Sequence, residues 1–211
     1  MQPTSSSPGP RTDSPRTDGP RTDGPLAEQP TARVDPIRMP PAELLEAALP
    51  GLTLALFTVL FGFAMGGIFG LNEGMIKGRL ADSAAAVTTT VYEGDVAAAE
   101  PVLAKSWAYM QRAHLHAGAI GTAAIGMILV LLLIGTTRST MRVLSLALGA
   151  GGLGYSVFWM WAGFIAPGLG STGAAKESLR WLAMPSAGAV MLAAAAVVVL
   201  CVRAMVRGPH R

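Results

Sequence analysis

Four long stretches of this sequence contain no Asp, Glu, Lys or Arg, and each is close to the length of a membrane-spanning helix. They cover residues 50–71, 117–137, 143–166 and 182–202. A hydrocarbon core about 30 Å thick needs about 20 residues of helix, because a helix rises about 1.5 Å per residue. The stretches lack the alternation of barrel strands, and helices satisfy their backbone hydrogen bonds internally. The sequence therefore predicts an all-α integral membrane protein with four transmembrane helices.

The composition also favours a membrane protein. Of the 211 residues, 51% are hydrophobic and only 14% are charged, against roughly 25% charged in an average soluble domain. The net charge of +3 comes from basic residues that stand singly at the ends of apolar runs, which is typical of topology signals and not of a phosphate-binding face. We therefore predict the lipid bilayer as a partner and expect no nucleic acid. The single cysteine, Cys201, excludes an intramolecular disulfide and the usual zinc clusters.

The first 38 residues differ from the rest of the chain. Between residues 10 and 24 a five-residue unit, Pro-Arg-Thr-Asp followed by Ser or Gly, occurs three times. Such a segment cannot bury apolar area, so we expect residues 1–38 to form a disordered cytoplasmic tail. Residues 39–211 then form the transmembrane domain. Its first part, residues 39–49, is predicted to be a short amphipathic helix at the membrane surface.

The connections between the four stretches predict how the helices are arranged. Spans two and three are joined only by residues 138–142, so they must be antiparallel neighbours. The long connection, residues 72–116, is predicted to be a helical extramembrane loop, whose second helix is capped by Asp95 and continues into span two. Ser171 or Thr172 is expected to cap a helix that leads into span four. The predicted fold is therefore an antiparallel four-helix bundle.

Basic residues near the span ends predict the orientation of the bundle. They stand in the shortest loop and after the last span: Arg138, Arg142, Arg203, Arg207 and Arg211. Lys and Arg near the ends of membrane helices are enriched on the cytoplasmic side. We therefore expect a multi-pass protein of the bacterial inner membrane with both termini in the cytoplasm.

Small residues at intervals of four predict where the helices meet, because helices in lipid associate through close backbone approach. The predicted packing positions are Gly62, Gly66 and Gly70 in span one and Gly118, Thr122 and Gly126 in span two. Four helices leave much of this small-residue surface uncovered. The same positions therefore also predict contact with a second copy of the chain, in a homo-oligomer, or with other membrane subunits.

Two histidines, His114 and His116, lie at the outer end of span two, and Glu73 lies at the same level after span one. Histidine at a membrane boundary can ligate haem, copper or zinc. Residues two apart differ by about 200° around a helix, so both rings cannot face one pocket. One hypothesis is a site with His114, His116 and Glu73 that holds haem b or copper. The other is a surface network of hydrogen bonds and ion pairs.

No motif in the chain specifies catalysis. The loop at 168–178 partly imitates a phosphate-binding loop, but its lysine does not directly follow Gly173, as such a loop requires. No ionisable residue lies near the middle of a span, which disfavours active transport. We therefore predict a non-catalytic accessory, assembly or structural subunit of a membrane complex. The alternative is a membrane redox subunit that binds haem, copper or quinone near the outer surface through His114 and His116.

Overall fold

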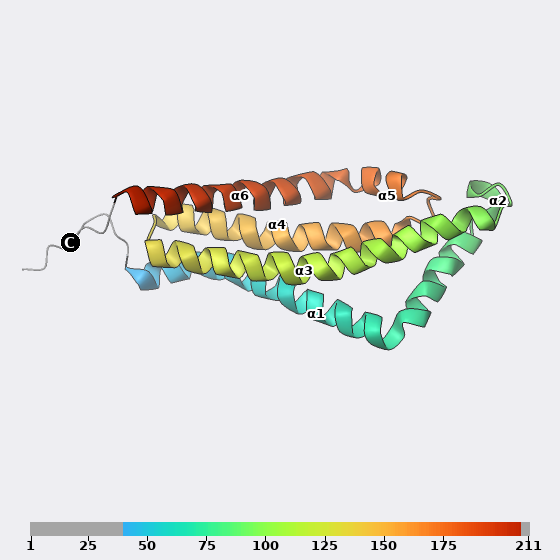
Figure 1. Ribbon diagram of the computed structural model, residues 1–211, viewed down its shortest axis with the longest axis horizontal. Helices are drawn as coiled ribbons and strands as arrows, with labels where there is room; N and C mark the ends of the chain where they lie inside the picture. Colours follow the sequence, from blue (N-terminus) through green and yellow to red (C-terminus); the bar gives the residue numbers. More distant parts are fainter. Residues whose placement is uncertain (1–39, 208–211) are drawn as a thin grey trace, which may run out of the picture. The chain divides into compact units, whose positions relative to one another are not determined.

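A computed structural model describes residues 40–207 as an all-α protein (Figure 1). Its elements are α1 (Pro41–Ala85), α2 (Thr88–Val91), η1 (Ala97–Ala99), α3 (Glu100–Ile134), α4 (Arg138–Ile165), α5 (Thr172–Ser178) and α6 (Arg180–Arg207). No strand occurs among these described residues. Helices α1, α3, α4 and α6 are long and apolar enough to cross a membrane. The predicted fold class is confirmed, whereas the tail predicted at 1–38 lies outside the described residues.

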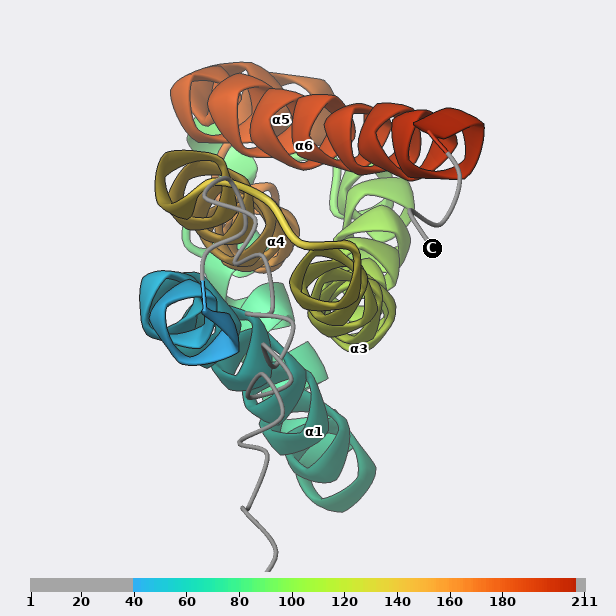
Figure 2. The same ribbon diagram turned by 90° about the vertical axis from the view of Figure 1, so that its left-hand side faces the viewer.

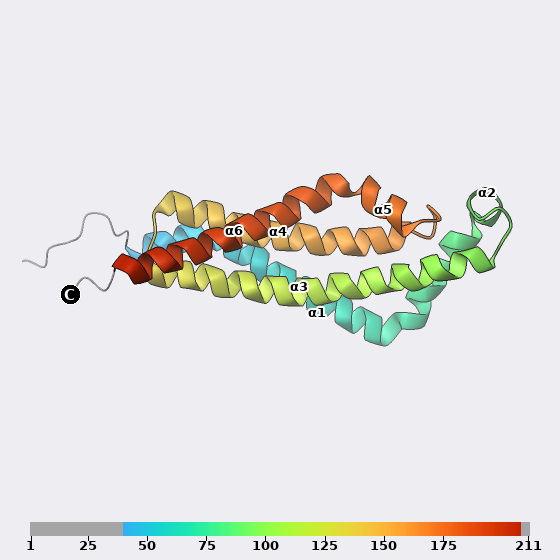
Figure 3. The ribbon, with the colours of Figure 1, turned by 45° about the horizontal axis from the view of Figure 1, so that its top comes forward.

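The four long helices alternate in direction. The start of α1, the turn between α3 and α4, and the end of α6 lie at one end of the bundle, and α2 and α5 lie at the other, which we call the α5 end (Figure 1). Helices α1, α3 and α4 pack against one another pairwise, whereas α6 packs mainly against α4 (Figure 2). Figure 3 shows that α6 runs obliquely to the other helices. The bundle is therefore a three-helix core with a fourth helix laid upon it.

Helix α1 begins earlier and ends later than the predicted first span. The short helix predicted at 39–49 is not separate from the first span, because this segment continues through Pro50 as part of α1. Three of its apolar side chains are buried in the bundle, which favours continuation of the helix. The buried residues are Leu44, Ala47 and Ala48. The bend of α1 occurs instead at Asn72, where φ is −134° and ψ is 27°.

Glycines bring α1 into direct backbone contact with α4. A Cβ atom added to Gly149 would collide with the carbonyl oxygen of Gly51, and one added to Gly51 would collide with the backbone of Ser145. All three residues are buried. In lipid such close approach supplies the van der Waals contact that holds helices together. The crossing of α1 and α4 therefore depends on the absence of side chains at these two glycines.

The predicted packing positions on α1 behave differently from one another. A Cβ atom on Gly62 would lie 3.0 Å from the backbone nitrogen of Gly118, and one on Gly66 would lie 2.7 Å from Cε1 of His114. Both glycines therefore face α3. Gly70, one turn further on, has no atom within 4 Å of its Cβ position. Only part of the predicted glycine row thus packs within the chain.

On α3 the buried face lies next to the predicted one. Thr122 and Gly126 are exposed, and the Cβ positions of Gly118 and Gly126 face open space. Gly121 packs instead, since its Cβ atom would lie 3.1 Å from the carbonyl oxygen of Ala55. The buried residues of this part of α3 are Ala113, Ala117, Gly121, Ala124 and Ile128. Small residues at intervals of four occur on both the buried face and the exposed face of α3, so this spacing alone does not show which face packs.

Two predicted helix caps are confirmed. The carboxylate of Asp95 accepts hydrogen bonds from the backbone nitrogens of Ala97, at 2.8 Å, and Ala98, at 3.3 Å. The hydroxyl of Ser171 accepts from the backbone nitrogens at the start of α5, at 3.2 and 3.3 Å. Each cap satisfies amide groups that have no partner within the helix. The Asp95 contacts fix the start of η1, which is followed directly by α3. The Ser171 contacts fix the start of α5, which precedes α6.

Tyr92 ties the segment after α2 to the loop after α4. Its hydroxyl donates a hydrogen bond of 2.8 Å to the carbonyl oxygen of Pro167. The residue is only 6% exposed, and burial raises the pKa of its hydroxyl above the usual value. The neutral phenol is therefore the form that the fold stabilises.

We expect Tyr92→Phe to lower the free energy of unfolding by about 1 kcal/mol, because it leaves the Pro167 carbonyl without its donor. In the wild type, the stability that the Tyr92 hydroxyl contributes is fully present below about pH 10. It is lost as the pH rises through the raised pKa of Tyr92 in the folded state. Thermal unfolding in mild detergent between about pH 8 and pH 11 measures both effects. Tyr155→Phe is the control, since no hydrogen bond of that hydroxyl occurs among the described residues. An equal alkaline loss in Tyr92→Phe and the wild type would contradict the assignment.

Candidate functional site

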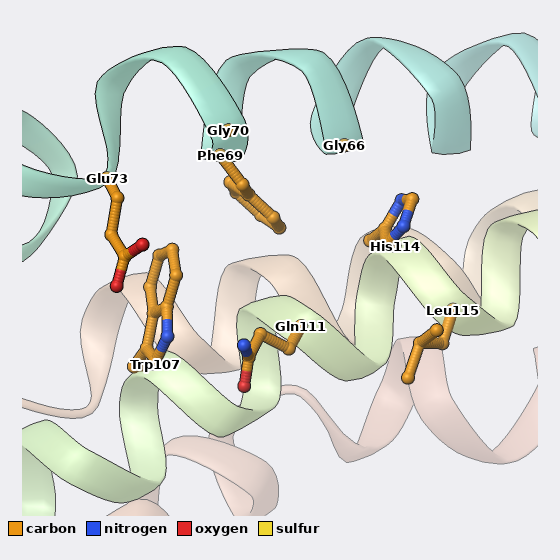
Figure 4. A pocket seen from close by; sticks show the side chains of 8 residues that line it. All are labelled: Gly66, Phe69, Gly70, Glu73, Trp107, Gln111, His114 and Leu115. Atoms are coloured by element: carbon orange, nitrogen blue, oxygen red, sulfur yellow. The ribbon is translucent and has the colours of Figure 1, made fainter.

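A pocket of about 400 Å³ lies between α1 and α3, close to the bend of α1 (Figure 4). Most of its lining residues are three or four positions apart along each helix, so each helix contributes one face. They are Gly66, Phe69, Gly70 and Glu73 of α1 and Trp107, Gln111, His114 and Leu115 of α3. The pocket thus joins two of the three residues predicted to form a site, Glu73 and His114.

The ring of His114 is held in one orientation against α1. Its Nδ1 atom lies 2.8 Å from the carbonyl oxygen of Gly62. A carbonyl oxygen only accepts, so Nδ1 carries the proton, and in the neutral ring Nε2 is then a hydrogen-bond acceptor. Gly66 makes room for this arrangement, because a Cβ atom there would lie 2.7 Å from Cε1 of the imidazole. Because Gly66 has no side chain, α1 can approach α3 closely and His114 can keep this orientation.

Aromatic rings form the interior wall of the pocket. Phe69 lies between the histidine and the tryptophan (Figure 4), with ring centroids 5.2 Å from Trp107 and 6.3 Å from His114. The ring of Phe69 is tilted by 58° to the indole and by 75° to the imidazole. Such tilted and edge-on contacts are favourable for aromatic pairs. The wall offers a ring-shaped apolar ligand both faces and edges to pack against.

Polar groups flank this wall. Glu73 forms a salt bridge with Lys77 one turn later on α1, and the ammonium of Lys77 also lies 5.1 Å from the centre of the Trp107 ring. The amide of Gln111 lies between Trp107 and His114 along α3 (Figure 4), and it can both donate and accept. The pocket therefore combines an imidazole acceptor, an amide and an ion-paired carboxylate with an aromatic interior. This combination suits a neutral ligand that has a ring and a few polar atoms.

His116 is not part of this pocket. Its ring packs on α4 instead, with centroids 5.3 Å from Tyr155 and 6.1 Å from Trp159. The two histidines therefore face different helices, as the helical offset of about 200° requires. Within residues 40–207 no group of three or more His, Cys, Asp or Glu side chains could hold a metal ion. The imidazole of His114 is thus the one histidine ligand that this part of the chain brings to the pocket.

The site also contains residues that the sequence interpretation did not assign to it. Phe69, Trp107 and Gln111 have no motif of their own, and only their helical spacing from His114 and Glu73 could have suggested a shared face.

Comparison with known proteins does not assign a function to the site. No protein-family model matches the sequence, no curated protein is detectably similar to it, and no solved structure is detectably similar to the fold.

Proposed function

We propose that the protein is a non-catalytic accessory or assembly subunit of a membrane complex. The observation that carries this proposal is a row of open glycines on α1. Gly67, Gly70, Gly74 and Gly78 follow one another at intervals of three or four, and a Cβ atom at any of them would meet no atom within 4 Å. The bend at Asn72 divides the row, with Gly67 and Gly70 before it and Gly74 and Gly78 after it. Each pair allows another helix to approach closely. We call it the open glycine row.

Other glycines of the bundle show what such positions do when a neighbour is present. At Gly51 and Gly149, a Cβ atom would collide with the backbone of an adjacent helix, and at Gly121 it would lie 3.1 Å from the carbonyl oxygen of Ala55. The chain therefore uses glycine where helices come into close contact. Large apolar side chains that are exposed lie beside the open glycine row, namely Phe63, Leu71 and Met75. The row with its apolar surroundings supports contact with a second copy or with another membrane subunit.

We expect Gly74→Leu combined with Gly78→Leu to convert the complex into the folded single chain. Both leucine side chains fit into open space on the single chain, whereas a neighbouring helix would collide with them. The mass of the particle purified in mild detergent measures the change and also identifies what comes with the wild-type chain. Gly188→Leu on α6 is the control, because that position is equally open. An unchanged mass in the α1 variant, or the same loss in the control, would contradict the proposal.

A second function, a membrane redox subunit that binds a quinone, is favoured by the geometry of His114. Haem and copper need several protein ligands in fixed directions, whereas a quinone or quinol needs only hydrogen bonds and ring contacts. Nε2 of His114 can accept from a quinol hydroxyl, and the amide of Gln111 can donate to a quinone carbonyl. The rings of Phe69 and Trp107 supply the apolar walls.

Titration with a water-soluble quinone tests this second function. Bound quinone is expected to quench the fluorescence of Trp107, which lines the pocket. The absorption spectrum and metal content of the purified protein distinguish the alternatives. A Soret band, or a metal present in stoichiometric amount, would replace the quinone by haem or by that metal.

We also propose that the protein lies in the inner membrane with the end opposite the α5 end in the cytoplasm. Arg138 and Arg142 lie at the start of α4, and Arg203 lies near the end of α6, so the fold collects these charges at one end of the bundle. Cytoplasmic enrichment of Lys and Arg supports this orientation. A reporter that is active only outside the cytoplasm, fused after the last residue, should therefore be inactive.

A further inference from the structure

Two positive charges meet an aromatic cluster at the α5 end. The rings of Tyr109 on α3 and Trp159 on α4 contact each other edge to face, with centroids 4.8 Å apart. The guanidinium carbon of Arg112 lies 5.5 Å from the centre of the Tyr109 ring and 5.2 Å from that of Trp159. The ammonium of Lys176 on α5 lies 5.9 Å from the centre of the same tyrosine ring. Helices α3 and α5 thus bring two cations to the Tyr109 ring, and α4 supplies the neighbouring ring of Trp159.

Within residues 40–207 no acidic side chain neutralises this pair. Neither Arg112 nor Lys176 forms a salt bridge with another described residue. The acid next to Lys176 in the sequence, Glu177, is paired with Arg180 at 3.3 Å, and Glu73 of α1 is paired with Lys77. Like charges at one ring repel each other, and an anion between them removes that repulsion. The cluster therefore attracts negative charge.

The hydrogen-bonding groups of the cluster also favour an anion. The indole Nε1 of Trp159 is buried and has no acceptor among the described residues. The side chains of Arg112, Lys176 and Trp159 are all donors without acceptor atoms. An anion with several oxygens can accept from more than one of them. A phosphate group has this property, and its hydrogen bonds to arginine and lysine are among the stronger ones in proteins.

The cluster lies at the boundary of the apolar region. Arg112 is the last charged residue before an uncharged stretch that ends at Arg138. Trp161 and Trp181 also contact each other edge to face, 6.4 Å apart, near the ends of α4 and α6 that flank α5. Tryptophan and tyrosine are enriched where a membrane meets water, at the level of the lipid headgroups. A phosphate that is part of a lipid is therefore presented at this level.

We propose that Arg112 and Lys176, together with Tyr109 and Trp159, bind the phosphate of an anionic phospholipid headgroup. A headgroup bound there bridges α3 and α5. Helix α5 leads into α6, which otherwise packs mainly on α4. The lipid thereby links the fourth helix to the three-helix core. Inorganic phosphate shares the recognised chemistry but has no acyl chains to hold it at the boundary.

Native mass spectrometry of the full chain with added lipid tests the proposal. The wild type is expected to retain phosphatidylglycerol and to retain phosphatidylcholine, which has no net charge, much more weakly. Arg112→Gln with Lys176→Gln should weaken retention of phosphatidylglycerol roughly 30-fold, since each basic residue at a membrane surface contributes about fivefold. Equal retention of the two lipids by the wild type, or unchanged retention in the double variant, would overturn the proposal.

A matched variant separates a specific site from general attraction. Arg142→Gln with Arg203→Gln removes the same charge at the other end of the bundle, and both residues are exposed and unpaired among the described residues. Retention should be unaffected in this control, and a loss equal to that of the first pair would overturn the proposal. Displacement of the lipid by millimolar inorganic phosphate would show that the site binds the free anion and would overturn the lipid assignment.

A single substitution keeps the test valid if loss of Arg112 disturbs the fold. Lys176 is exposed, so Lys176→Gln leaves the packing of the two rings in place. This variant should retain phosphatidylglycerol about fivefold more weakly, and Lys176→Arg should restore retention, because the positive charge is kept. Unchanged retention in Lys176→Gln would count against the site by itself.

Discussion

Gly149→Ala is expected to lower the free energy of unfolding by about 3 kcal/mol, within the range of severe overpacking. The added Cβ atom collides with the carbonyl oxygen of Gly51 and lies 2.9 Å from Cβ of Leu54. Neither group can turn away, because one belongs to the backbone of α1 and the other is attached directly to it. The two helices must therefore separate, and much of their van der Waals contact is lost.

Gly126→Ala is the matched control for this prediction. It adds the same methyl group to a helix in the same bundle, but its Cβ position has no atom within 4 Å. Alanine favours the helix over glycine by up to about 1 kcal/mol, so this variant should be as stable as the wild type or more stable. Unfolding by heat in mild detergent, followed by circular dichroism, compares the two. Equal effects would contradict the backbone contact between α1 and α4.

Gly66→Ala is expected to weaken quinone binding about tenfold, which corresponds to the loss of one good hydrogen bond. The new Cβ atom lies 2.7 Å from Cε1 of His114, so the imidazole must leave its position. The 2.8 Å contact between Nδ1 and the Gly62 carbonyl is then lost, and with it the fixed direction of Nε2. Gly67→Ala is the control, because the Cβ position of Gly67 is open. Quenching of tryptophan fluorescence by the quinone measures both variants.

A double variant shows whether Gly66 acts through the histidine. His114→Phe keeps an aromatic ring in the pocket but removes both nitrogen atoms, and it should weaken binding at least as much as Gly66→Ala. In the His114→Phe background the further change Gly66→Ala should have little additional effect on binding, because the two residues act as a unit. Full quinone binding by His114→Phe would exclude His114 as a ligand contact. It would leave the accessory role untouched, since that role depends on the open glycine row.

Helix α3 contributes residues of the two proposed sites from different faces. His114 contacts α1 and lines the pocket, whereas Arg112 and His116 contact the aromatic residues of α4. Each residue of a helix is turned by about 100° from the one before, so positions two apart face nearly opposite directions. The proposed quinone site and the proposed lipid site therefore lie on different faces of this short segment. Variants in one site should leave binding at the other unchanged.

The sequence by itself determined the fold class, the four apolar helices and their alternating direction. The causes are local. A long uncharged stretch in lipid must form its backbone hydrogen bonds within itself, which makes it a helix. The short link at 138–142 allows its two flanking helices only an antiparallel arrangement. The caps at Asp95 and Ser171 were predictable for the same reason, since each bonds amides two or three residues away. The offset between His114 and His116 also followed from helix geometry alone.

Only the tertiary structure decided which faces of these helices meet. Glycine rows at intervals of four occur on packed and open faces alike, so the sequence could not show that Gly121 is buried and Gly126 is open. The pocket likewise involves Gly66, where the absence of a side chain lets a histidine of α3 approach the backbone of α1. Contacts between residues far apart in the chain depend on how closely two backbones approach. That distance is set by the packing of the whole bundle and not by any local pattern.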